Sequence, residues 1–145
     1  MRKTLSIPEK ASDPTINICL DTINLRKQSL VFVNTKRGAE AQAEKISKKT
    51  EISGAAYNEL AGKALKALSK PTKQCQRLAL CLRKGIAFHH AGLPAGQREL
   101  VEDNFRNGVI KVICCTPTLA FGMNLPAFRT VIRDLQRYGP RGMEP

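Results

Sequence analysis

The chain has 145 residues, about the length of one domain, and 42% of them are apolar, so its composition argues against a disordered chain. No apolar run is long enough to cross a bilayer, and the basic N-terminus lacks the apolar core of a signal peptide, so we expect an intracellular protein without membrane contact. The formal net charge is +12, from 24 Lys and Arg residues against 12 Asp and Glu residues, which favours an anionic partner.

The basic residues are concentrated in one segment of the chain. Between Glu59 and Glu99 there is no acidic residue, whereas eight basic residues lie in this interval: Lys63, Lys66, Lys70, Lys73, Arg77, Arg83, Lys84 and Arg98. A field of one sign attracts polyanions, so nucleic acid is the first partner to consider. The alternative is a solvated helix face that keeps the protein soluble, and for any single lysine this alternative is favoured.

The five cysteines predict a structural role. Their number is odd, no C-x-x-C spacing occurs, and Cys114 and Cys115 are adjacent in an apolar run. Neighbouring strand residues point to opposite faces, so these two thiols would not act together. We expect free thiols, most of them packed in the core, and no zinc site.

Helices and short apolar strands alternate along the chain. Residues 1–12 are expected to form a tail or an inter-domain connector, and Asp13 followed by Pro14 predicts the start of a helix. Helices are predicted over about 14–26, 36–48, 51–70, 73–84 and 94–106, and strands over 30–34, 86–90, 109–115 and 129–137. This alternation predicts an α/β domain with a parallel sheet and helices on both faces.

Three strand-to-helix corners are expected at the carboxyl edge of this sheet, where ligands of α/β proteins bind. They are Asn34-Thr35-Lys36-Arg37, His89-His90-Ala91-Gly92 and Thr116-Pro117-Thr118. Lys36 and Arg37 oppose the helix dipole, so they are better explained by an anionic ligand than by helix stability. Free amides beside hydroxyls suit phosphates, and a row of such corners suits a chain of phosphates. Taken alone, however, each corner is ordinary for an α/β protein.

Motifs for nucleotide hydrolysis are missing from this sequence. It contains no G-x-x-x-x-G-K followed by Ser or Thr, no G-x-G-x-x-G, and no D-E-x-D or D-E-x-H after a strand. His89 and His90 should face opposite sides of a strand and cannot easily share a metal ion. A polar contact or a packing role is expected for each histidine, with a general base as the alternative.

Four segments resemble parts of superfamily 2 helicases. Residues 31–37, Val-Phe-Val-Asn-Thr-Lys-Arg, resemble motif IV, and residues 88–93, Phe-His-His-Ala-Gly-Leu, resemble motif IVa. Residues 116–127 resemble motif V, with the pattern T-x-T-L-A-x-G-x-N-L-P-A. Residues 131–138 are similar to the start of the β-hairpin of archaeal Holliday-junction-migration (Hjm) helicases. Over residues 13–145 the chain thus resembles the second RecA-like domain of such a helicase.

The resemblance implies a RecA-like, P-loop NTPase-type three-layer domain. The intact enzyme would be an ATP-dependent helicase that moves 3′ to 5′ on single-stranded DNA and unwinds forked or branched DNA in repair and recombination. The resemblance implies no catalytic residue in this chain. It assigns contacts with the DNA backbone to Asn34, Thr35, Arg37, His90, Thr116 and Thr118. Gly122 and Asn124 would lie at the ATP cleft and couple DNA binding to the nucleotide state. A hairpin beginning near Val131 would separate the strands, and its residues include Arg133, Arg137 and Tyr138.

Cofactors and partners follow from the same resemblance. ATP and Mg²⁺ would serve the intact enzyme, bound mainly by a first domain whose Walker A and DExH motifs this sequence lacks. Motif VI, Q-x-x-G-R-A-G-R, is also missing and the hairpin stops at its tip. We therefore expect a domain truncated at its C-terminus that folds, holds no cofactor and does not hydrolyse ATP.

The implied partners are single-stranded and forked DNA and the other domains of the same helicase. The implied location is the cytoplasm, in association with the nucleoid. Two alternatives remain open at this point. One is a stand-alone nucleic-acid-binding or partner-docking domain without a motor. The other is a domain of a related RNA helicase.

Overall fold

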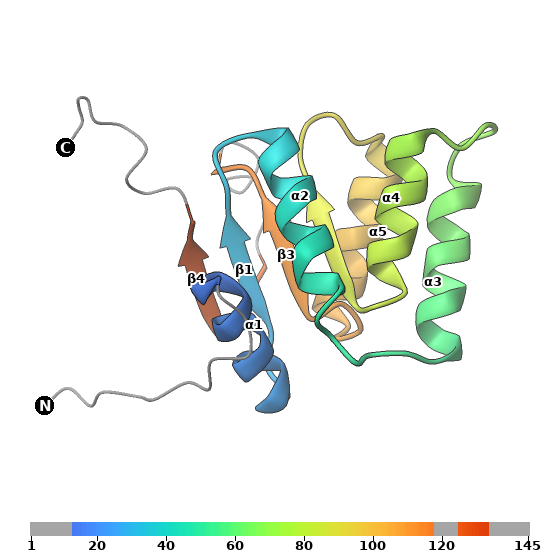
Figure 1. Ribbon diagram of the computed structural model, residues 1–145. Coiled ribbons are helices and arrows are strands. Elements are labelled where there is room, and N and C mark those ends of the chain that lie inside the picture. The colour runs from blue at the N-terminus through green and yellow to red at the C-terminus, as the bar shows by residue number, and fades with distance from the viewer. Residues whose placement is uncertain (1–12, 118–124, 134–145) are drawn as a thin grey trace, which may run out of the picture.

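A computed structural model describes residues 13–117 and 125–133 of the chain (Figure 1). Nine elements lie in these ranges: α1 (Pro14–Asn24), β1 (Ser29–Phe32), α2 (Lys36–Ser47), α3 (Ala55–Lys66), α4 (Lys73–Leu82), β2 (Ile86–His89), α5 (Ala95–Arg106), β3 (Val112–Cys115) and β4 (Arg129–Ile132). The predicted tail 1–12 lies outside the described residues. So do five predicted site residues: Thr118, Gly122, Asn124, Arg137 and Tyr138.

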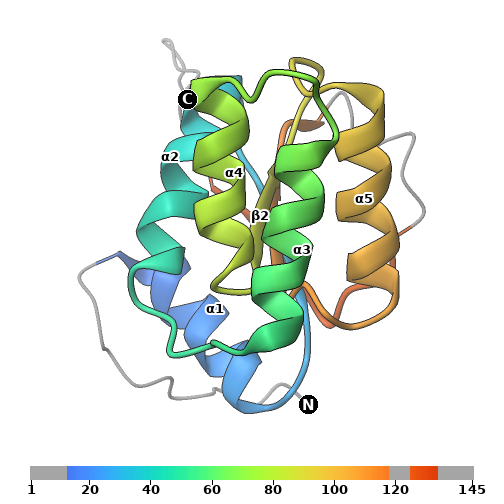
Figure 2. The ribbon, with the colours of Figure 1, turned by 90° about the vertical axis from the view of Figure 1, so that its right-hand side faces the viewer.

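The four strands form one parallel sheet in the order β2-β3-β1-β4. Helices α1, α2 and α4 cover one face of this sheet, and α5 covers the other (Figures 1 and 2). Helix α3 stands outside this layer, where it packs against α4 (Figure 2). The predicted three-layer α/β architecture is therefore confirmed.

Helix starts and ends follow the local chemistry of the sequence. The Asp13 carboxylate accepts a hydrogen bond from the Thr15 amide at 2.9 Å, and the Thr72 hydroxyl accepts one from the Cys75 amide at 3.1 Å. These side chains satisfy amides that have no partner inside the first helical turn. Gly85 follows α4 with a φ of 76°, a left-handed conformation that favours glycine.

The core lies on both faces of β2 and β3, whose residues are all buried. Phe88 of β2 and Phe105 of α5 are among the largest fully buried side chains. All five cysteines are buried and free, as predicted. Burial raises the pKa of the Cys19, Cys81 and Cys115 thiols to about 12, so these thiols are poor nucleophiles at neutral pH.

Residues 129–132 form a strand as predicted, and Val131 pairs in parallel with Val31 of β1, so this strand belongs to the main sheet. The predicted hairpin extends from here into residues outside the described part of the chain. One prediction needs correction. The helix predicted over 51–70 is shorter, because Gly54 precedes it with a φ of 133° and the helix ends at Lys66, before Pro71. None of the helices in the described part of the chain is long and apolar enough to cross a membrane.

Candidate nucleic-acid interface

The carboxyl ends of the four strands are level with one another. Phe32 is paired with Cys115 and with Ile132, and Cys115 is also paired with His89. The chain that leaves each strand therefore emerges at the same edge of the sheet, which we call the C-terminal edge. The structure brings the three predicted corners together there, as a parallel sheet requires.

The first corner joins β1 to α2 and carries exposed polar side chains. Thr35 has an extended backbone, and its hydroxyl accepts a hydrogen bond from the Gly38 amide at 2.9 Å. A Cβ atom on Gly38 would lie 2.8 Å from the Thr35 hydroxyl oxygen, so this turn requires glycine. Lys36 and Arg37 are exposed in the first helical turn, where the amide groups and the dipole favour an anion.

The second corner follows β2, and its histidine points inward. His90 is 1% exposed and its ring stacks on Phe88, with 5.8 Å between the ring centroids. Its Nδ1 accepts a hydrogen bond from the Gly92 amide at 2.9 Å, and its Nε2 lies 2.7 Å from the Glu40 carboxylate. This burial contradicts a direct contact between the His90 ring and DNA; the exposed residues of this corner are Ala91 and Gly92.

The loop 90–93 is also held from the α5 side. The Arg98 guanidinium donates to the Leu93 carbonyl at 3.1 Å and to the Ala91 carbonyl at 3.4 Å. The Leu93 amide donates to the His90 carbonyl at 3.1 Å, which closes a tight turn. Arg98 therefore stabilises the conformation of this loop.

His89 points to the opposite face of the sheet, as predicted. It is fully buried, and its Nε2 lies 2.7 Å from a carboxylate oxygen of Glu102 in α5. Its Nδ1 is buried without a hydrogen-bond partner in the described structure. Burial lowers the pKa of His89, and the Glu102 carboxylate opposes that shift. Both histidines thus have the predicted polar and packing roles, on two separate faces.

The third corner begins at Thr116, directly after β3. Thr116 is 7% exposed, and Pro117 is helical. The described chain stops at Pro117 on this side, so only the entry of the predicted anion seat can be placed. It lies at the C-terminal edge between the chain segments that follow β1 and β2.

Arg133 follows β4 at the same edge. Its Nε donates to the Gln42 side chain at 3.0 Å, and its Nη2 lies 3.9 Å from the Asp13 carboxylate. Its amide donates to the Phe32 carbonyl at 2.9 Å, which continues the pairing of β4 with β1. The guanidinium thus contacts groups of α2 and of the α1 cap, and the predicted role of Arg133 in a hairpin stays a prediction.

Sequence reasoning missed a cluster of charged side chains beneath the second corner. Glu40 of α2 has a side chain only 9% exposed, and it accepts hydrogen bonds from His90, from Gln74 at 3.0 Å and from Arg77 at 2.7 Å. Arg77 also pairs with Glu44 at 2.8 Å, and this bond lowers the pKa of the Glu44 carboxyl. The one sequence feature that indicates this cluster is the position of Arg77 in the segment without acidic residues. Any carboxylate that pairs with Arg77 must come from another part of the chain.

The basic segment 63–98 is therefore not one uniform surface. Arg77 and Arg98 are used in contacts within the domain, as described above. The other six cations of the segment are exposed on α3, in the connection from α3 to α4, at the start of α4 and after its end. Part of the positive charge thus has a structural role, which the sequence alone did not separate from a partner-binding role.

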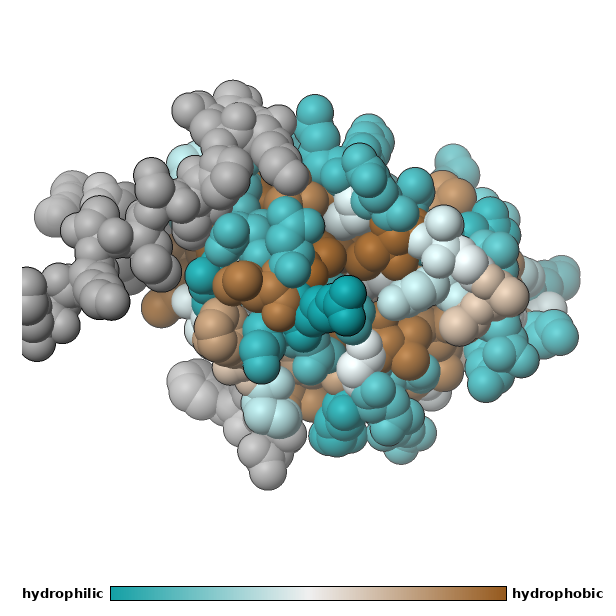
Figure 3. Space-filling view, turned by 90° about the horizontal axis from the view of Figure 1, so that it is seen from below, coloured by the Kyte–Doolittle hydropathy of each residue, from teal (hydrophilic) through white to brown (hydrophobic). Residues whose placement is uncertain are grey.

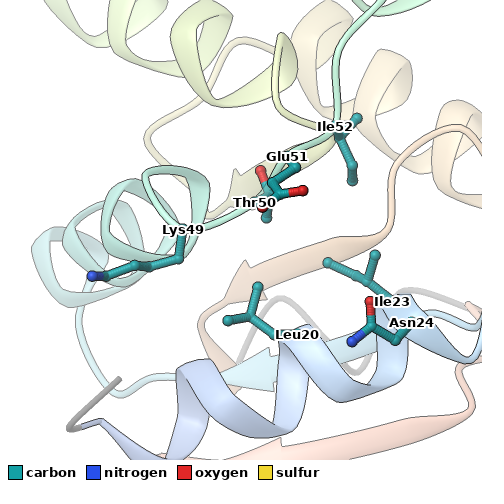
Figure 4. Close-up of a pocket in the computed structure, with 7 residues that line it drawn as sticks. All are labelled: Leu20, Ile23, Asn24, Lys49, Thr50, Glu51 and Ile52. Atoms are coloured by element: carbon teal, nitrogen blue, oxygen red, sulfur yellow. The ribbon is translucent and has the colours of Figure 1, made fainter. Parts of the chain in front are cut away.

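The opposite edge of the sheet carries a cavity of about 230 Å³. It is lined by residues of α1 and of the segment that follows α2: Leu20, Ile23, Asn24, Lys49, Thr50, Glu51 and Ile52 (Figure 4). On the face seen from below, apolar side chains lie between hydrophilic ones (Figure 3). The cavity lies at the opposite edge from the three corners, and Lys49 is the one cation among its lining residues, so we do not assign it to a phosphate chain.

Comparisons with known proteins identify relatives of this chain. A family model described as "Helicase conserved C-terminal domain" matches residues 67–140. The chain is 44% identical over 130 residues to the ATP-dependent DNA helicase Hel308 of Methanococcus vannielii, and 47% identical over 126 residues to that of Pyrococcus horikoshii. These matches cover 88% and 86% of this chain but only 17% of each relative, so the chain spans about a sixth of their length.

Proposed function

Because the chain belongs to the helicase conserved C-terminal domain family, we propose that it is the second RecA-like domain of an ATP-dependent DNA helicase. In this proposal the domain binds the phosphate backbone of single-stranded DNA at the C-terminal edge of its sheet. The whole enzyme moves 3′ to 5′ and unwinds forked or branched DNA, in association with the nucleoid. The other domains of that helicase are the partners of this one.

The observation that carries this proposal is the alignment of the three corners. Thr35, Lys36 and Arg37 are exposed at one helix start, and Thr116 and Pro117 follow the neighbouring strand at the same edge. Amides of a helix start, hydroxyls and cations are the groups that bind phosphates without reading sequence. The relatives named above are DNA helicases, which supports DNA as the polyanion.

Each corner has a separate part in this proposal. Arg37 and Thr35 contact the backbone directly, with Asn34 beside them, and the backbone of the loop 90–93 contacts the next phosphates in place of the buried His90 ring. Thr116 and Thr118 hold a further phosphate. Gly122 and Asn124 remain proposed for the ATP cleft, and Arg133, Arg137 and Tyr138 for strand separation, with the hairpin starting after Ile132.

ATP and Mg²⁺ belong to the whole helicase in this proposal. No group of three or more His, Cys, Asp or Glu side chains among the described residues is placed to hold a metal ion. The sequence also has no phosphate-cradling G-x-x-x-x-G-K motif. In this proposal the work of the described residues is to bind and orient DNA.

A titration of a labelled single-stranded oligonucleotide tests the proposal. We expect binding that weakens steeply between about 50 mM and about 200 mM salt, because phosphate contacts release counterions. Arg37→Ala should lower the affinity by about threefold to tenfold. It should also reduce the slope of log affinity against log salt concentration by the amount expected for about one phosphate contact. Arg83→Ala removes the same charge from the exposed chain after α4, at the opposite edge, and serves as the matched control.

Equal affinity of the Arg37→Ala and Arg83→Ala variants would contradict the proposed DNA track, because the charge would then act without regard to position. A second comparison uses Thr116→Ala beside Thr116→Ser, which keeps the hydroxyl. A competing ribo-oligonucleotide of the same sequence decides between DNA and RNA. A clear preference for the ribo-oligonucleotide would favour the RNA helicase alternative.

A further inference from the structure

We propose that Glu40 is a positioning residue that fixes the loop 90–93 relative to the N-terminus of α2. Glu40 lies one turn into α2, the helix whose start carries Thr35 and Arg37. Through His90 it reaches the loop that supplies the second corner. This inference rests on the proposed function, because it states how two of the DNA-binding corners keep their spacing.

The hydrogen bonds of His90 determine which ring nitrogen carries the proton. The Gly92 amide donates to Nδ1 at 2.9 Å, so Nδ1 acts as an acceptor. Nε2 therefore carries the proton and donates it to a Glu40 oxygen at 2.7 Å. The loop amide, the ring and the carboxylate form one continuous chain of hydrogen bonds from the loop to α2.

Both oxygens of Glu40 are needed in this chain. Oε1 accepts from the Arg77 guanidinium at 2.7 Å, and Oε2 accepts from the His90 ring at 2.7 Å and from the Gln74 amide at 3.0 Å. A glutamine at this position would have to turn its NH₂ group toward one of these donors. With the NH₂ toward His90, the ring tautomer must invert, which gives up the bond to the Gly92 amide. With the NH₂ toward Arg77, two donors face each other and the Glu40–Arg77 ion pair is lost.

The loop 90–93 packs tightly against the His90 ring. A Cβ atom on Gly92 would lie 2.9 Å from Cε1 and 3.0 Å from Nδ1 of His90. The ring is also stacked on Phe88 at an interplanar angle of 6°. The position of the Gly92 backbone is thus determined by the ring, and the position of the ring is determined by Glu40.

The pair His89–Glu102 on the other face is a matched control. Its Nε2–oxygen distance is the same 2.7 Å, and Glu102 is also a helix glutamate. However, the His89 Nδ1 has no partner in the described structure, so this pair holds no loop amide. Among the described residues, the second Glu102 oxygen is paired with Arg106 alone, at 3.8 Å, so a glutamine can keep its carbonyl oxygen toward His89.

Binding of a labelled single-stranded oligonucleotide by the Glu40→Gln and Glu102→Gln variants tests this inference. Each substitution removes one negative charge from a basic protein, and charge alone would make DNA binding tighter in both. We expect Glu40→Gln to bind about tenfold more weakly than the unaltered chain. Glu102→Gln should bind as tightly as the unaltered chain, or up to about twofold more tightly.

The outcomes separate this inference from the proposed function. Weaker binding by Arg37→Ala together with unchanged or tighter binding by Glu40→Gln would overturn the role of Glu40 and leave the DNA track standing. Absence of binding by the unaltered chain, or unchanged binding by Arg37→Ala, would overturn both. Thermal unfolding of each variant shows whether it is folded at the temperature of the titration.

A second variant covers the case that Glu40→Gln does not fold. Gly92→Ala displaces the ring from the loop side and keeps all charges, and we expect about fivefold weaker binding from it. Gly96→Ala in α5, where an added Cβ meets nothing within 4 Å, is its control. Binding by Gly92→Ala that equals that of Gly96→Ala would overturn the proposed positioning.

Discussion

The two adjacent histidines after Phe88 are chemically alike, yet they differ in what they hold. His89 and His90 are both buried, and each binds a glutamate at 2.7 Å. His90 uses its second nitrogen to hold a loop amide, whereas the second nitrogen of His89 has no partner in the described structure. The His89–Glu102 pair therefore contributes to packing alone, whereas the His90–Glu40 pair also fixes a loop at the C-terminal edge. The two pairs differ because the two histidines face opposite sides of the sheet.

The largest effect should come from removing each ring. We expect His90→Ala to lower the free energy of unfolding by about 3 kcal/mol, because it opens a cavity beside Phe88 and leaves the buried Glu40 with fewer donors. His89→Ala should cost less, about 2 kcal/mol, because Glu102 is partly exposed and water can replace the ring as its donor. Chemical denaturation of both variants measures the difference. A larger loss for His89→Ala would reverse the ranking of the two pairs.

A smaller effect should come from adding one methyl group beside the His90 ring. Gly92→Ala should lower the free energy of unfolding by about 1 to 2 kcal/mol, because the new Cβ lies within 3.0 Å of two ring atoms. Gly96→Ala should instead stabilise the protein by about 0.5 to 1 kcal/mol, because alanine is the better residue in an open helix position. Unfolding curves of the two variants should therefore move in opposite directions. A shift in the same direction would mean that the ring is free to adjust.

The smallest expected effect is the pH dependence of stability that comes from His89. Burial holds the pKa of His89 below its ordinary value of 6.5, so the unfolded chain takes up a proton before the folded one. Stability from this group should fall as the pH drops below 6.5 and should level off below the folded pKa. Glu44, with a pKa lowered from 4.5, adds its own loss only in a more acidic range.

Unfolding midpoints at about pH 7.5 and about pH 5.5 measure this dependence. The difference between the two midpoints should shrink in His89→Gln, which cannot titrate. An equal difference in the variant and in the unaltered chain would assign the pH dependence to other groups.

The pattern of short apolar strands and capped helices was sufficient to predict the fold. Asp13, Thr35 and Gly85 act within two or three residues of their own position, so local chemistry predicts them well. The alternation of elements predicted the parallel sheet, and the sheet in turn predicted that the three corners converge.

The contacts between distant segments could not be predicted in the same way. Glu40 and His90 are 50 residues apart, and nothing in the spacing around either residue indicates the other. The inward orientation of His90 depends on which strand face meets α2, which is a property of packing. The neighbour of β4 could not be predicted either, because nothing in residues 129–132 indicates that this strand pairs with β1 at the edge of the sheet.

The most direct test of the central claim is a map of backbone amide chemical shifts while an unlabelled single-stranded oligonucleotide is added to the isotope-labelled chain. We predict that the largest changes fall at residues 35–38, 91–93 and 116, at the C-terminal edge of the sheet. Residues 24–28, 49–54 and 108–111 at the opposite edge should change little. Changes centred on the exposed lysines of α3 and α4 would contradict binding at the C-terminal edge, because DNA would then bind the general positive charge and not the aligned corners.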